Sequence, residues 1–353
     1  MANAIITATG SYIPERVIPN RYFLEHQFFD SSGIRLERPN AAIIEKLEEI
    51  TGIKERRYVT SDLTTSDIAF MAAKEALSGV DRESLDYIIV GQNIGDMTVE
   101  RHQTDMVPCI AARVKHKLEI KNPYTVAFDI PFGCPGWLQA TIMADYLIKS
   151  GDAKRILTIG AEVLSRITDP HDVDCMIFAD GAGATLLEAT EENAGILSHL
   201  TRSDTHNEAF LIWLTESNCP DRQGNKLMLK MKGHEIYKYA VRRVPEHIKE
   251  NLDKAGIGVG EVKKILLHQA NEKMDAAMLN RLFHLYRIKD IPADIMPMII
   301  SWAGNSSVAT LPILLDVILK GKLDGHRLNS GDIAVFASVG AGMNINSMIY
   351  RAP

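Results

Sequence analysis

The segment IPFGCPGW (residues 130–137) joins an expected β-strand to an expected α-helix, and the fold assignment starts from this junction. In the strand YTVAFDI (124–130), apolar side chains alternate on one face at Val126, Phe128 and Ile130. Pro135 suits the first helical position, because the N–H that proline lacks would have no partner there. Downstream, apolar residues recur at the spacing of a helix face: Leu138, Ile142, Met143, Tyr146 and Leu147.

Cys134 lies in this junction, at the N-terminus of the expected helix. The partial positive charge of a helix N-terminus favours thiolate over thiol, so we expect a lowered pKa and a nucleophilic sulfur. The alternative is that Cys134 is a small core residue, as free cysteines beside apolar neighbours often are. The other three cysteines are far apart and form no CxxC pair, so neither a zinc site nor a disulfide framework is indicated: Cys109, Cys175 and Cys219.

The composition of the 353 residues is that of a globular protein, with 46% hydrophobic and 24% charged residues. The net charge of -6, with no block of basic residues, argues against a nucleic-acid binder. No apolar run approaches the roughly 20 residues that a membrane-spanning helix needs. The first residues resemble no secretion signal, so we expect a cytoplasmic protein.

Buried-strand patterns recur along the chain with helical stretches between them, which predicts an α/β protein with mostly parallel sheets. Because the second half repeats the theme of the first, we expect a duplication with halves 1–190 and 191–353. No Gly/Ser linker separates the halves, so they should pack as one unit. The strand patterns are at 4–10, 87–94, 125–130, 155–164, 183–189, 195–200, 263–269, 332–340 and 344–351.

Two further polar residues are expected at the carboxyl ends of strands, where α/β folds place reactive groups. His268 follows the apolar run in KKILLHQAN, and Asn305 follows Gly304 in SWAGNSSVATLPILL. Taken singly, a histidine here is commonly structural and an asparagine after glycine is commonly a turn or cap residue. Together with Cys134 they supply a nucleophile, a proton carrier and an oxyanion donor, the inventory of a cysteine acyl-transfer site.

The combination resembles the thiolase superfamily, and within it the ketoacyl-acyl-carrier-protein synthase III group. Six motifs stand in that family's order over nearly the whole chain: TGIKERRYV (51–59), GCPGW (133–137), FADGAGA (178–184), HQAN (268–271), GNSS (304–307) and GDIAVFASVGAG (331–342). The resemblance implies a five-layered α/β/α/β/α thiolase fold and a homodimer. It also implies a ping-pong reaction that needs no metal or organic cofactor.

Carried over residue by residue, the resemblance implies that Cys134 accepts an acyl primer from acyl-CoA or an acyl-carrier thioester. His268 and Asn305 would then hold malonyl-acyl-carrier protein while it loses CO2, and the N–H groups of Cys134 and Ala341 would form the oxyanion hole. The product would be a 3-oxoacyl-carrier protein. Positions that match the family's surface for the acidic carrier are Lys238, Lys273 and Arg281.

Within the superfamily, the residues favour the synthase III arrangement. Degradative thiolases carry a second cysteine in the C-terminal glycine loop, which here reads SVGAGMN (338–344), and synthases I and II carry a histidine where this chain has Asn305. Head-to-head acyl condensers and enzymes like hydroxymethylglutaryl-CoA synthase need a glutamate base near Val107, and Glu100 keeps that alternative open. A specialised-metabolite enzyme and a silent subunit of a heterodimer also stay open. A papain-like hydrolase would need a different setting for its cysteine.

The chain departs from the family at the expected CoA site. Lys46 and Ile50 replace the tryptophan and arginine that commonly grip the adenine, and the segment from Asn20 to Glu49 is longer than usual. Pro131, Phe132 and Gly133 replace the small residues before the cysteine. We therefore expect weakened CoA recognition, or a substitute adenine contact from residues 20–49.

Overall fold

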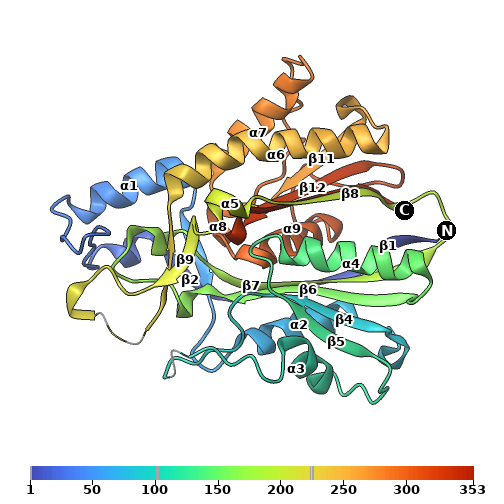
Figure 1. Ribbon diagram of the computed structural model, residues 1–353, viewed down its shortest axis with the longest axis horizontal. Helices are drawn as coiled ribbons and strands as arrows, with labels where there is room; N and C mark the ends of the chain where they lie inside the picture. Colours follow the sequence, from blue (N-terminus) through green and yellow to red (C-terminus); the bar gives the residue numbers. More distant parts are fainter. Residues whose placement is uncertain (1, 101–102, 223, 225) are drawn as a thin grey trace.

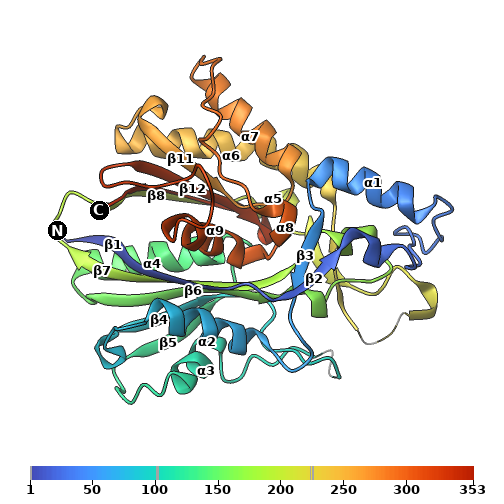
Figure 2. The ribbon, with the colours of Figure 1, turned by 180° about the vertical axis from the view of Figure 1, so that it is seen from behind.

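In the computed structural model, helices and sheets alternate as five layers, α/β/α/β/α, which can be followed from top to bottom in Figure 1. Helices α6 and α7 form one outer layer and α2 with α3 the other. Helices α4 and α9 lie between the two sheets, as the reverse view in Figure 2 also shows. The structure describes residues 2–100, 103–222, 224 and 226–353.

The first sheet has the strand order β1-β7-β6-β4-β5. Strands β5 and β6 run parallel to β4, whereas β7 is antiparallel to both β6 and β1. Its strands span β1 Asn3–Tyr12, β4 Tyr87–Gly91, β5 Val126–Ile130, β6 Arg155–Val163 and β7 Asp180–Thr190. Strand β5 therefore occupies one edge of this sheet.

The second sheet has the order β11-β12-β13-β8 and is built from the second half of the chain. Only β11 and β12 are parallel, because β13 returns from β12 by a tight turn and β8 pairs antiparallel with β13. Its strands span β8 Gly195–Ser203, β11 Val262–Leu267, β12 Ile333–Gly340 and β13 Asn344–Arg351. The expectation of mostly parallel sheets was therefore wrong, since hairpin-like returns join strands that the apolar patterns alone do not orient.

The helices cover both faces of each sheet through apolar side chains. Helices α4 and α9 contact strands of both sheets, so the central core includes Trp137 and Leu138 from α4 with Leu314 and Leu315 from α9. Two further cores lie under the outer helix layers. The helices span α1 Asn40–Thr51, α2 Thr65–Ala76, α3 Ile110–Lys117, α4 Gly136–Ser150, α5 Thr205–Glu208, α6 Gly233–Ala255, α7 Glu272–Leu285, α8 Ile300–Ala303 and α9 Thr310–Leu319.

Two small antiparallel pairs stand outside the main sheets. Strand β2 (Arg16–Pro19) pairs with β3 (Glu55–Tyr58), and β9 (Ile212–Thr215) pairs with β10 (Met228–Met231). Residues 20–49 lie between β2 and β3 and include most of α1. Within the described part of the chain, no helix is both long and apolar enough to cross a bilayer.

Candidate functional site

Cys134 lies four residues after the end of β5, immediately before the N-cap of α4. The helix begins at Gly136 with Pro135 as its N-cap, one residue later than expected, and the Gly136 amide donates to the Gly133 carbonyl at 3.0 Å. Close packing brings this helix start onto the sheet, because a Cβ at Gly91 of β4 would lie only 2.5 Å from the Gly136 carbonyl carbon. The sequence of small residues thus holds the thiol at the sheet edge.

The electrostatic expectation for Cys134 was wrong. The pKa of the Cys134 thiol is raised to about 11, chiefly by burial and to a smaller extent by the charge of Glu162, while the hydrogen bond from the Ser307 hydroxyl acts in the opposite direction. Although Cys134 is partly exposed, the desolvation of its sulfur is the largest contribution to this shift. The thiol is therefore protonated at neutral pH, and its attack on a thioester requires that the proton be taken up as the bond forms.

His268 directly follows β11, and its backbone N–H donates to the Ala337 carbonyl on β12 at 2.9 Å. The side chain is 4% exposed, and no described residue forms a hydrogen bond with its Nδ1. Burial lowers the pKa of His268 to about 4, so the imidazole is neutral at pH 7. A neutral imidazole is able to accept a proton or to donate a hydrogen bond to a developing oxyanion.

Asn305 is held by its backbone against the chain that leads into β7. Its N–H donates to the Ile177 carbonyl at 3.0 Å, and its carbonyl accepts from the Ala179 N–H at 2.8 Å. The side-chain Oδ1 accepts from the Ser307 N–H at 2.8 Å, and no described residue accepts a hydrogen bond from Nδ2. Asn305 follows the short helix α8 and Gly304 rather than a strand end, which corrects its expected placement. Its amide nitrogen is free to donate to a ligand.

The C-terminal glycine loop contacts the nucleophile segment backbone to backbone. A Cβ at Gly340 would lie 2.4 Å from the Cys134 nitrogen, and a Cβ at Gly133 would lie 2.6 Å from the Ala341 nitrogen. Both contacts require glycine, and Gly133 also has a positive φ of 65°. The structure therefore brings the Cys134 and Ala341 segments together, and the role of their N–H groups as two donors to one oxyanion stays a prediction.

Ser307 is a site residue that the sequence analysis missed. Its Oγ lies 3.4 Å from the Cys134 Sγ, and it adopts a left-handed backbone conformation with φ 52°, which is uncommon for serine. Such strained positions concentrate at functional sites. The motif GNSS contained the residue, but nothing in it distinguished a serine that contacts sulfur from a turn serine.

Glu162 on β6 is the second missed residue. It is fully buried, and its Oε2 accepts from the Asn93 Nδ2 at 2.7 Å. Asn93 in turn accepts from the Gly133 N–H through Oδ1 at 2.8 Å. An acid inside the apolar run RILTIGAEVL was the available signal, because buried carboxyl groups are rare outside functional or paired settings.

A channel-like cavity of about 660 Å³ reaches Asn305. Its wall is largely apolar and comes from α1, the start of α6 and the turn after His268. Cys134 and His268 themselves do not line it. Two other hollows, of about 870 and 950 Å³, are not lined by Cys134, His268 or Asn305. Its wall includes Leu36, Arg38, Lys46, Leu47, Ile50, Val173, Asp174, Ile177, Met231, Tyr237, Asn271 and Met274.

Comparison with known proteins places this architecture. Residues 128–205 match the family model of 3-oxoacyl-[acyl-carrier-protein (ACP)] synthase III, and residues 252–352 match the model of its C-terminal part. The chain is 32% identical over 360 residues to the beta-ketoacyl-[acyl-carrier-protein] synthase III of Cereibacter sphaeroides, which covers 99% of this chain and 98% of that protein. The chain belongs to the 3-oxoacyl-acyl-carrier-protein synthase III family.

Solved structures of the family agree with the fold. The 3-oxoacyl-[acyl-carrier-protein] synthase III of Aquifex aeolicus superimposes with a TM-score of 0.78 at 31% identity, over 99% of this chain and 100% of that one. The synthase III of Thermus thermophilus gives a TM-score of 0.82 at 29% identity, over 99% of both chains. The resemblance inferred from the six motifs and the five-layered thiolase fold are thereby confirmed.

The three residues proposed for carrier binding lie on the outer helix layer. Lys238 is on α6, and Lys273 and Arg281 are on α7. Each forms an ion pair with a neighbouring glutamate, at 3.5 Å to Glu235, 2.9 Å to Glu49 and 3.1 Å to Glu246, respectively. Tyr237 and Met274, their chain neighbours, line the channel, so two of the three lie beside it. Their role stays a prediction.

Glu100 and Val107 lie in the segment between β4 and α3. Both are exposed, and Val107 is 85% exposed. Glu162, and not Glu100, is the buried glutamate, and hydrogen bonds through Asn93 link it to the loop that carries the nucleophile. Glu100 as a base for head-to-head condensation stays a prediction.

Proposed function

We propose that this protein is an acyltransferase that condenses an acyl primer with malonyl-acyl-carrier protein through an acyl-Cys134 intermediate. The observation that carries the proposal is the contact of the GNSS segment with the nucleophile, Ser307 Oγ to Cys134 Sγ at 3.4 Å, with Asn305 fixed two residues earlier. Family membership over the whole chain supports the same reaction, since its relatives carry the name beta-ketoacyl-[acyl-carrier-protein] synthase III.

In the first half-reaction, the Cys134 sulfur bonds to the carbonyl carbon of an acyl thioester and the donor's carbon–sulfur bond breaks. The Cys134 proton passes to the leaving thiolate, and the neutral imidazole of His268 is suited to carry it. The N–H groups of Cys134 and Ala341 stabilise the tetrahedral oxyanion. The products are the acyl-enzyme and a free thiol.

In the second half-reaction, the malonyl thioester loses CO2, and the electron pair of the broken carbon–carbon bond becomes an enolate. His268 and the Asn305 Nδ2 donate hydrogen bonds to the enolate oxygen. The enolate carbon attacks the acyl-Cys134 carbonyl, and the sulfur leaves and regains a proton. The product is a 3-oxoacyl thioester on the carrier; the carbanion is the electron pair left on the malonyl carbon when CO2 departs, and the proton that the sulfur regains comes from solvent.

Intact-protein mass spectrometry with a panel of acyl-CoAs tests this proposal. We expect a mass gain of one acyl group on the wild type and none on Cys134→Ala. Peptide mapping should place the label on Cys134 and not on the other cysteines. A label on Cys109, Cys175 or Cys219, or no acylation by any donor, would refute the proposed reaction.

We also propose that the protein acts as a homodimer that pairs β5 with its copy. Strand β5 is an open sheet edge with Val126 46% exposed and Tyr124 nearby 84% exposed, and such an edge is a template for another strand. An isologous two-fold pairing closes both edges at once.

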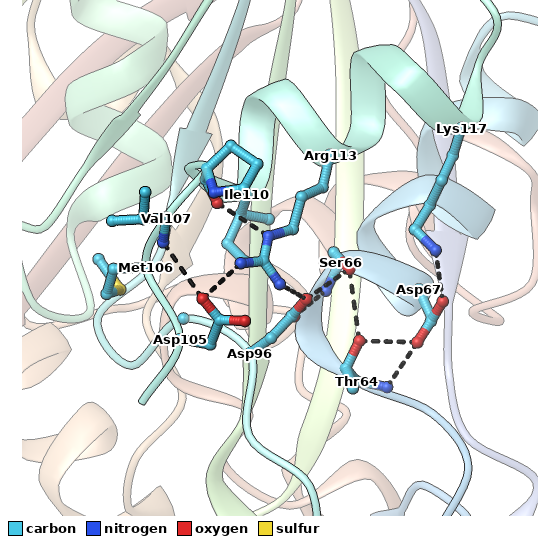
Figure 3. A network of polar contacts seen from close by, with 12 residues as sticks. Thr64, Ser66, Asp67, Asp96, Asp105, Met106, Val107, Ile110, Arg113 and Lys117 are labelled. Atoms are coloured by element: carbon cyan, nitrogen blue, oxygen red, sulfur yellow. Dashed lines mark hydrogen bonds and ion pairs between the residues drawn. The ribbon is translucent and has the colours of Figure 1, made fainter. Parts of the chain in front are cut away.

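The exposed Val107 lies on a segment that a polar network holds in place, as Figure 3 shows. Arg113 bridges Asp96 at 2.8 Å and Asp105 at 2.6 Å, and Asp96 accepts from the Ser66 N–H and hydroxyl. An apolar side chain presented on a fixed loop suits a protein contact.

Light scattering tests the proposed pairing of β5. It should give a dimer for the wild type and a monomer for Val126→Lys, because an edge lysine blocks strand pairing. A wild-type monomer would refute the dimer.

A further inference from the structure

Behind the nucleophile, a hydrogen-bonded chain of three residues, of which Glu162 and Gly133 are buried and Asn93 is partly exposed, connects β6 to the loop that carries Cys134. The Gly133 N–H donates to the Asn93 Oδ1 at 2.8 Å, and the Asn93 Nδ2 donates to the Glu162 Oε2 at 2.7 Å. The Asn93 backbone N–H also donates to the Glu162 Oε1 at 3.3 Å. Both carboxyl oxygens of Glu162 are therefore engaged by one residue, which leaves the Asn93 side chain a single orientation.

Gly133 is the point where this chain controls backbone geometry. It has a positive φ of 65°, and its α-carbon packs against the Ala341 amide so closely that a Cβ would lie 2.6 Å from the Ala341 nitrogen. The next peptide N–H is that of Cys134, which abuts Gly340. Fixing the Gly133 amide thus fixes the relative positions of the two N–H groups assigned to the oxyanion hole.

The charge of Glu162 also bears on the sulfur. Its side chain is fully buried, and burial raises the pKa of Glu162 to about 7. The hydrogen bonds from Asn93 and the Ile94 N–H oppose this rise, whereas the charge of Asp180 on β7 adds to it. Ionised Glu162 in turn raises the pKa of the Cys134 thiol. Glu162 is therefore coupled to Cys134 both through Asn93 and through its charge.

We propose that Glu162 and Asn93 are positioning residues that align the Gly133–Cys134 backbone for acyl transfer and set how readily the thiol ionises. The acyl-transfer role rests on the proposed function. The alignment of the backbone and the ionisation of the thiol do not depend on which thioester is the substrate. Asn93 acts on Cys134 through the Gly133 amide, and Glu162 acts through Asn93 and through its charge. Glu162 fixes the orientation of the Asn93 side chain, and the Asn93 side chain fixes the position of the Gly133 backbone N–H.

The variants separate position from charge. Glu162→Gln keeps an oxygen that accepts from Asn93 but removes the titrating proton. Glu162→Ala and Asn93→Ala each break the chain. Thr158→Val is the matched control, because Thr158 is a fully buried polar residue of the same strand whose hydroxyl lies 2.7 Å from that of Thr185. It reports what the loss of any buried polar contact in β6 does to stability.

The first readout is the alkylation rate of Cys134 by iodoacetamide between pH 6 and 10, which requires no substrate. We expect Glu162→Gln to alkylate about three- to tenfold faster than wild type at pH 8.5, the effect of half to one pKa unit. Its rate should also rise uniformly with pH where the wild-type profile bends near pH 7. An unchanged profile in Glu162→Gln would overturn the ionisation part of the proposal.

The second readout is the kcat and KM of acylation in single-turnover assays. We expect Glu162→Ala and Asn93→Ala each to lose about 10- to 100-fold in kcat with KM within about twofold, since a misaligned oxyanion donor costs transition-state stabilisation. Glu162→Gln should restore kcat to within about threefold. The double variant should lose no more than either single one, because the two residues act as a unit.

The alignment part would be overturned if Glu162→Ala and Asn93→Ala lost no more kcat than Thr158→Val does at equal Tm. It would also be overturned if the losses in kcat of the two single variants added in the double variant. If Glu162→Ala does not fold, Glu162→Gln and Asn93→Ala still decide it. Failure of the proposed function is recognised separately: the wild type would then take no acyl group, while the alkylation profiles of the same variants would still differ as predicted.

Discussion

The Ser307 hydroxyl and the Cys134 sulfur lie 3.4 Å apart, so the residue two positions after Asn305 contacts the nucleophile. A hydroxyl donating to the sulfur stabilises the thiolate, and Ser307 indeed opposes the rise in the Cys134 pKa that burial causes. Hydrogen bonds to charged groups contribute about 1.5 to 3 kcal/mol. We therefore expect Ser307→Ala to slow alkylation of Cys134 at pH 8 by about tenfold or more. Ser306→Ala is the matched control, and equal rates for the two variants would contradict this role.

Asn305 should serve the second half-reaction more than the first. Asn305→Ala removes the amide donor, and Asn305→Asp keeps an oxygen for the Ser307 N–H but also has no amide to donate. Both variants should form the acyl-enzyme, while decarboxylation falls by about 100-fold or more, the usual loss for one oxyanion donor. Single-turnover assays of each half-reaction measure this, and equal losses in both halves would argue against the division of labour.

The predictability of the site differs between its parts for physical reasons. The nine strand patterns all correspond to strands, because a buried strand needs a run of apolar residues whatever its direction. Strand direction depends on the connections, which is why the expectation of mostly parallel sheets failed at the antiparallel pairings of β7, β8 and β13. Cys134, His268 and Asn305 could be proposed from the sequence because their motifs are contiguous, and their roles stay predictions. Ser307 and Glu162 act through contacts between segments, and no local pattern records such contacts.

The pKa of Cys134 also could not be predicted from the sequence, because it depends on contacts between segments. The helix N-terminus is visible in the sequence, but the degree of burial of the sulfur is not, and desolvation is the larger effect here. The proposed halves, 1–190 and 191–353, match the residues that supply the two sheets, although α4 and α9 share one core between them. That boundary therefore stays a prediction.

The donor preference should follow from the channel wall. Lys46 and Ile50 both line the channel, where neither side chain stacks on a base as tryptophan does, and Arg38 is a second cation, besides Lys46, that residues 20–49 contribute there. We expect acyl-CoA and acyl-pantetheine to acylate Cys134 at similar rates. Lys46→Trp should speed acylation by acyl-CoA alone by about 5- to 100-fold, since stacking on a base contributes about 1 to 3 kcal/mol. If wild type already prefers CoA by several orders of magnitude, Arg38→Ala should abolish that preference.

Carrier docking should depend on Lys273 and on salt. Lys273 is 53% exposed and pairs with Glu49, so charge reversal removes a cation from the rim near the channel and places two acids together. Rim charges act mainly on the encounter rate and are screened by salt. We expect Lys273→Glu to slow the reaction with malonyl-acyl-carrier protein at low salt and to approach wild type at high salt. Glu49→Gln controls for the broken ion pair, and Lys322→Glu controls for net charge. An unchanged low-salt rate would remove this surface from consideration.

Glu162 should make stability depend on pH in a defined direction. Its pKa is about 7 in the folded protein against 4.5 in the unfolded reference, so between these values the folded state binds more protons. The stabilisation is fully present below pH 4.5 and is lost as pH rises through 7. The shift corresponds to about 3 kcal/mol. His268 acts oppositely, because its pKa falls to about 4 and stability rises with pH up to 6.5, but it is common to wild type and Glu162→Gln.

The comparison of these two proteins therefore isolates Glu162. Denaturant unfolding at pH 5 and pH 8 should show the free energy of unfolding of wild type falling relative to Glu162→Gln by most of that amount, with the change centred between pH 5 and 7. Thr158→Val should track wild type over the same range, because threonine does not titrate there. A difference between wild type and Glu162→Gln that stays constant with pH would mean that Glu162 is ionised throughout, and the bend expected in the alkylation profile would then be absent as well.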